Sequence, residues 1–315
     1  MKPVYALLDQ ATERPDCDFA PDWKQGWRLK FDESYAVAHF SRDYYYRAIL
    51  ERHQGHWQAA LLSVKTGLGV ARHLNTPSPN DFFSQISCER DFLVELQRDL
   101  IAFGGEAGFR RELRSLLAAW PKPPSFRRSF PVQLLRLDAG CRDIHAFDED
   151  QGDDIRADST IKYLWRFESL RMATLAQCLN DYADIWEQTE KEPENWRLLR
   201  DIMAKKSKEQ DAQISIVSAL RVAVGERWDT YAAHSVGRLN AHRRLTQVGL
   251  DLFEAKTKTG AFPPTLPHSA SSDPFGTGAF VYRRSGPTFV LYSVGPNGID
   301  DGGKAVDDVE FARPL

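Results

Sequence analysis

Most of the chain repeats its apolar residues with the period of an α-helix. From residue 34 to about 238, apolar residues recur at spacings of three and four, and strand-like alternation is scarce. Glycines and prolines divide this region, because proline cannot continue a helix and glycine weakens one. The segments predicted to be helical are 35–53, 57–73, 81–103, 107–119, 127–146, 159–191, 194–203 and 207–258, the last of which an interruption near Gly225 or Gly237 could divide.

The first two of these helices carry small residues where they would cross. Gly55 separates the helices, Ala48 and Ala60 allow a close approach, and Tyr45 and Trp57 fill the space beside them. The pattern resembles a tetratricopeptide-type hairpin, but no second copy follows at that family's period of roughly 34 residues. We therefore interpret the pair as a packing motif and not as a repeat.

After Gly260 the pattern changes from helix to strand. Phe262-Pro263-Pro264 ends the last helix, and Asp273-Pro274-Phe275-Gly276 is typical of a turn. Aromatic and β-branched residues are enriched at 279–284, 288–293 and 309–312. The fold class predicted is mainly α: a multi-helix body at 1–236, tetratricopeptide-like in part, and a small α+β module at 237–315 with a three-stranded antiparallel sheet.

Composition and charge exclude several classes of function. The 315 residues include 41 basic and 44 acidic residues, a formal net charge of −3, which gives no electrostatic basis for binding nucleic acid. No stretch approaches the roughly 20 apolar residues of a membrane span, so the sequence read literally predicts a soluble, cytoplasmic chain. Its four cysteines are far apart, which excludes zinc ribbons and leaves disulfides and buried thiols open.

The sequence contains no recognisable catalytic motif. A G-x-S-x-G elbow, a P-loop and a G-x-G-x-x-G fingerprint are all missing, so no catalytic or cofactor-binding residue is proposed. His53-x-x-His56 straddles the Gly55 break and lacks the partners of a zinc site. His145 stands among several acidic residues between 143 and 154, which we interpret as a solvated loop.

The C-terminal motifs, taken in order, resemble a known family. Gly260-x-Phe262-Pro263, then the turn at 273–276, Val281-Tyr282-Arg283 and the run 291–303 follow the order found in major pseudopilins of type II secretion. Residues 15–18 and 55–61 are similar to uncharacterised planctomycete and verrucomicrobial envelope proteins that join a helical body to this module. The resemblance implies an extracytoplasmic place, in the periplasm or envelope, behind an N-terminal anchor that this chain lacks; if Met1 is the true start, the cytoplasm is expected.

In pseudopilins the corresponding loop holds calcium, and the resemblance implies a similar Ca²⁺ site here. Carried over by position, the ligands would be the carbonyls of Val294 and Ile299, the Asn297 side chain, and the carboxylates of Asp307 and Asp308, with further oxygens from Asp300 and Asp301. Calcium takes six to eight oxygens of these kinds. Asn297 replaces an aspartate common in the family, which lowers the charge of the site. An acidic surface turn that holds no ion is the alternative.

These observations predict a non-catalytic envelope protein that acts in assembly or as a binding scaffold. Its expected partners are other envelope proteins or further copies of itself, and a membrane only through the missing anchor. Two alternatives stay open: a hydrolase acting on envelope polymers with its site in the helical body, and a soluble tetratricopeptide-like adaptor that binds peptides. Convergent carboxylates or histidines in a cleft would favour the hydrolase.

Overall fold

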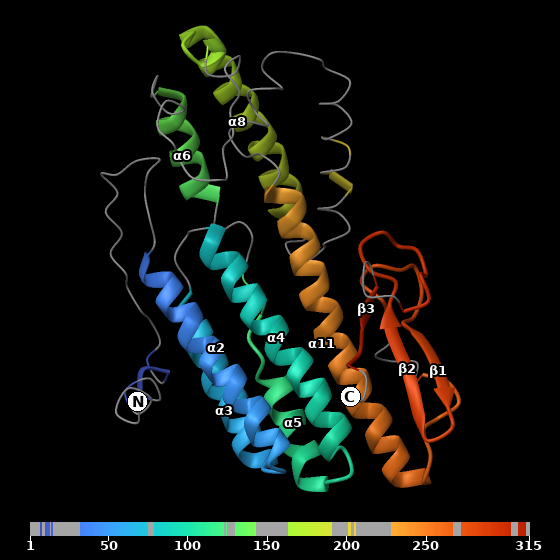
Figure 1. The fold of residues 1–315 in the computed structure, drawn as a ribbon. Helices are drawn as coiled ribbons and strands as arrows, with labels where there is room; N and C mark the ends of the chain where they lie inside the picture. Colours follow the sequence, from blue (N-terminus) through green and yellow to red (C-terminus); the bar gives the residue numbers. More distant parts are fainter. Residues whose placement is uncertain are drawn as a thin grey trace.

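The computed structural model of this chain describes residues 7, 10–12, 14, 32–74, 79–122, 124, 130–142, 163–190, 201, 202, 205, 228–266, 272–303 and 308–312 (Figure 1). In these ranges the chain is mainly helical and carries one small antiparallel sheet, which confirms the mainly-α fold class. None of the helices in the described ranges combines the length and apolarity needed to cross a membrane.

Four helices of the body end close to where the sequence predicts. They are α2 (Asp32–His53), α3 (Trp57–Ala71), α4 (Pro79–Phe103) and α5 (Ala107–Ala118). Helix α6 (Phe130–Arg142) lies within the predicted range 127–146, and the residues directly before and after it lie outside the described ranges. The helix predicted over 159–191 is interrupted by a turn, where the amide of Phe167 bonds the carbonyl of Leu164 at 3.2 Å, and α8 (Glu168–Glu190) follows it.

The long last helix, α11 (Trp228–Thr259), is continuous through Gly237, so an interruption at that position is wrong. Gly225 and most of the helix expected over 194–203 lie outside the described residues. The boundary expected between 236 and 237 falls inside α11. The division into two domains at that position stays a prediction.

The α2–α3 pair packs closely because small residues lie at its contacts. Ala48 and Ala60 are fully buried. Gly55 lies in the middle of the connection between the two helices and has a φ of 79°. A Cβ on Gly67 would lie 2.2 Å from the ring of Phe92, so only glycine allows α3 to approach α4 this closely.

Helix α11 lies between α4 and the sheet, as Figure 1 shows. The sheet has the order β1-β2-β3, formed by β1 (Val281–Ser285), β2 (Thr288–Ser293) and β3 (Val309–Glu310), and both pairs are antiparallel. Strand β3 is therefore shorter than the predicted 309–312. Buried side chains from the helices and from the sheet belong to a single continuous hydrophobic cluster.

Gln97 links the body to the C-terminal residues. Its side chain is buried in α4, and its Nε2 donates to the carbonyl of His242 (3.3 Å) and to the hydroxyl of Thr246 (3.1 Å) on α11. Its Oε1 accepts a hydrogen bond from the amide of Ala312, just after β3, at 3.0 Å. One amide thus holds three segments that are far apart in the sequence.

Candidate functional site

Asp273 holds the start of the acidic loop that follows β2, residues 294–303. This carboxylate is 2% exposed and accepts hydrogen bonds from the Phe275 amide (2.8 Å), the Ser293 hydroxyl (2.6 Å) and the Val294 amide (2.9 Å). The turn at 273–276 is thereby joined to the end of β2. Val294, expected as a carbonyl ligand, has its position set by this contact.

Glycines let the loop reverse direction repeatedly. Gly295, Gly298, Gly302 and Gly303 all have positive φ, between 68° and 77°, a conformation that residues with a Cβ rarely adopt. Asn297 shapes the turn between them: its Oδ1 accepts from the Ile299 amide at 2.9 Å, and its Nδ2 donates to Asp301 at 2.9 Å. The side chains of Asn297 and Asp301 are therefore in contact.

Asp300 faces the sheet. Its Oδ1 accepts from the buried Tyr292 hydroxyl at 2.7 Å and from the Gly302 amide at 2.9 Å. These two donors lower the pKa of Asp300. Burial, and then the bond to Asp300, raises the pKa of Tyr292 to about 12. One oxygen of Asp300 thus braces the loop, while the other takes part in neither of these bonds.

Asp308 is the residue that best fits a cation. Its side chain is 2% exposed, and its Oδ2 accepts from the Gly303 amide at 2.7 Å, so the carboxylate faces the glycine loop. Within the described part of the chain its Oδ1 is buried without a hydrogen-bond partner. A buried carboxylate oxygen without a partner is costly, and a bound cation would satisfy it.

The remaining ligands from the sequence prediction are only partly assembled. Asp307 lies outside the described residues. Among the residues that are described, no three histidine, cysteine or acidic side chains converge on one point. The expected set also counts the backbone carbonyls of Val294 and Ile299. The calcium site therefore stays a prediction.

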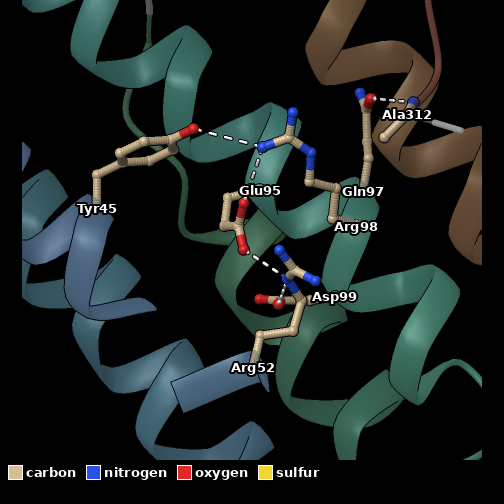
Figure 2. Close-up of polar contacts among 7 residues, drawn as sticks. All are labelled: Tyr45, Arg52, Glu95, Gln97, Arg98, Asp99 and Ala312. Atoms are coloured by element: carbon tan, nitrogen blue, oxygen red, sulfur yellow. Dashed lines mark hydrogen bonds and ion pairs between the residues drawn. The ribbon is translucent and has the colours of Figure 1, made fainter. Parts of the chain in front are cut away.

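A second polar cluster, which the sequence did not predict, lies inside the helical body (Figure 2). Glu95 and Asp99, one turn apart on α4, are both fully buried. Arg52 of α2 places its Nε 2.7 Å from Glu95 Oε1 and 3.6 Å from Asp99 Oδ1. Arg98 bonds the other Glu95 oxygen at 3.2 Å and the Tyr45 hydroxyl at 3.4 Å.

Arg52 is close to both carboxylates, whereas Arg98 is paired with Glu95 alone, so the charge of Asp99 is the less well compensated. Burial, and then the charge of Glu95, raises the pKa of Asp99 to about 8, although Arg52 lowers it. Neither carboxylate is among the described residues that line the cavities beside α3 and beside the sheet. The pair forms a buried polar contact between α2 and α4, and the hydrolase stays an open alternative.

The structure describes only some of the other sequence candidates. His53 and His56 are exposed, and His56 lies 3.2 Å from Glu51. The group around His145 lies outside the described residues, as does Cys17, whereas Cys88, Cys141 and Cys178 are buried as thiols.

Comparison of this chain with protein-family models, with curated proteins and with solved structures found no match.

Proposed function

We propose that this chain is a non-catalytic cell-envelope protein whose helical body carries a pseudopilin-like, calcium-stabilised C-terminal module. The module acts in assembly or as a binding scaffold, with other envelope proteins or further copies of the chain as partners. Asp308 is the observation that carries the proposal. A carboxylate that is nearly inaccessible to water, with one oxygen left without a partner, gives a cation a reason to bind.

The surrounding loop supports the same reading. Its donors are carboxylates, one amide and carbonyl oxygens, the mixture that calcium accepts in irregular geometry. Asp273 and Tyr292 hold the two ends of the loop against the sheet, so an ion would bind to a loop that is already shaped. Gln97 would pass that added stability to the helical body, because it bonds both α11 and the segment after β3.

The test is calorimetric unfolding of the full chain with calcium and with a chelator. Calcium at 100 times its dissociation constant is expected to stabilise the chain by about 2.7 kcal/mol and to raise Tm accordingly. Asp308→Asn keeps the shape but removes the charge, and should abolish most of this rise. Replacing Asp307 and Asp308 together with alanine should abolish all of it.

Asp43→Asn is the matched control, since Asp43 is an exposed carboxylate on α2, away from the loop. That variant should respond to calcium as the wild type does. Magnesium should stabilise less, because it requires tighter octahedral geometry. A calcium response that survives the double replacement would remove the ion from the proposal.

A further inference from the structure

A cavity on the outer side of α3 is independent of the acidic loop. It has a volume of about 550 Å³, within the range of small-molecule sites, and lies among α2, α3 and the end of α5. Tyr44, Leu68, Leu116 and Trp120 supply apolar walls. Gly69 contributes a wall without a side chain, against which Thr12 rests: a Cβ on Gly69 would lie 2.8 Å from that of Thr12.

Trp120, which forms an aromatic wall of the cavity, is held in place by contacts with α4 and α11. The Trp120 indole donates its Nε1–H to the buried Glu89 carboxylate on α4 at 3.3 Å. The guanidinium of Arg243 on α11 donates to the carbonyl of the next residue, Pro121. The cavity therefore has one rigid apolar side that a ligand would not have to order on binding.

The charged residues of the cavity are all positive. Arg47, Lys65 and Arg72 line it, and none of the described lining residues is acidic. Lys65 and Arg72 are two helical turns apart on one face of α3, roughly 10 Å along its axis. Among the described residues, Glu112 lines the adjoining groove, and Glu89 accepts the hydrogen bond from Trp120.

These three cations differ from other basic residues of the chain. Arg52, Arg98, Arg114 and Arg142 each form a close ion pair. In the described part of the chain, the side chains of Arg47, Lys65 and Arg72 form no hydrogen bond and no close ion pair, and all three are exposed. Burial raises the pKa of Glu89, and the more distant charge of Arg72 acts in the opposite direction.

We propose that this cavity binds a small phosphate monoester that carries an apolar or aromatic part. A phosphate monoester has close to two negative charges and three acceptor oxygens, which match two guanidinium groups and an ammonium group better than a single carboxylate does. The hydroxyls of Ser63 and Thr66, also in the lining, add donors. The walls around Trp120 and Leu116 would cover the organic part.

The test is isothermal titration calorimetry on the full chain at low salt, with AMP and phenyl phosphate as probes. At least one ester is expected to bind with one-to-one stoichiometry, and adenosine, phenol and inorganic phosphate should bind about tenfold more weakly or worse. Lys65→Glu and Arg72→Glu should each weaken binding of the ester by at least about tenfold, since each variant loses a charge-assisted contact. Leu62 also lines the cavity, and its side chain is 60% exposed. Leu62→Ser should therefore weaken binding of the ester without unfolding the chain.

Arg111→Glu is the matched control: it reverses an exposed arginine of α5 that does not line the cavity, and the ester affinity should not change. The proposal is overturned if neither ester binds, or if reversal at Arg111 weakens binding as much as reversal at Lys65. Binding of vesicles that contain phosphatidic acid, without binding of either soluble ester, would assign the cations to a membrane surface and also overturn it.

Discussion

Asp273 shows how one carboxylate can hold two distant segments. The side chain is buried and accepts three hydrogen bonds, two of them from residues twenty or more positions later, Ser293 and Val294. Asp273→Ala would leave these donors buried without partners, so the free energy of unfolding should fall by about 2–4 kcal/mol. Urea denaturation of the two proteins measures the difference. Asp301→Ala, at a more exposed carboxylate in the loop after β2, should cost much less. An equal loss would contradict the bridging role of Asp273.

The sequence predicts the turn at Asp273 but not the bonds that Asp273 forms with the end of β2. Asp273-Pro274-Phe275-Gly276 indicates a turn, because aspartate bonds its own backbone two residues on, and the bond to the Phe275 amide is of that kind. The bonds to Ser293 and Val294 depend on how the turn packs against β2, and local spacing carries no information about that packing. For the same reason, the family resemblance implies Asp308 as a ligand, but the sequence alone does not predict that its side chain is buried.

Helix α4 is an element with acidic groups on its buried side. Its ends were predicted within two residues, because its apolar positions follow the helical period. The burial of Glu89, Glu95 and Asp99 was not predicted, since a periodic pattern assigns charged positions to the surface. Trp120 and Arg52 come from other segments, so only the tertiary structure brings them to Glu89 and Glu95, whereas Arg98 is on α4 itself, three residues after Glu95.

The raised pKa of Asp99 predicts a pH-dependent stability. The folded protein retains this proton up to about pH 8, whereas the unfolded chain releases it near 3.8. Between these values the folded state binds more protons, so stability falls as pH rises. The lowered pKa of buried His242, about 3, has the opposite effect, but only below its ordinary value of 6.5.

The window from pH 6.5 to 8 lies between the ordinary pKa of His242 and the raised pKa of Asp99, and a comparison with Asp99→Asn removes the contributions of other groups, such as Glu89. Relative to Asp99→Asn, the wild type should lose free energy of unfolding across this window, by at most about 1.4 kcal/mol per pH unit. Urea denaturation at both ends of the window gives the double difference, and Asp43→Asn serves as the exposed control. A difference that stays constant between the two pH values would show that Asp99 is ionised in the folded chain.

On the scale of the whole molecule, the packing around α11 predicts that helices and sheet unfold together. Gly249 of α11 lies where α11, α4 and the segment after β3 meet. A Cβ on Gly249 would be 2.4 Å from the ring of Phe311 and 3.2 Å from Leu100 of α4. Gln97 bonds both sides of the same junction. Leu100 and Phe311 belong to one hydrophobic cluster, which contains described residues of both the helices and the sheet.

Gly249→Ala tests this directly. Overpacking against Phe311 should cost about 1–3 kcal/mol, offset in part by the gain of up to about 1 kcal/mol from replacing a helical glycine. Every tryptophan lies at or before Trp228, so tryptophan fluorescence reports the helical body, while amide exchange in β2 reports the sheet. In one cooperative unit both probes lose the same free energy. Gly105→Ala, which meets nothing within 4 Å, should leave both unchanged or slightly raised. Loss of protection in β2 alone would show instead that the sheet opens without the helices.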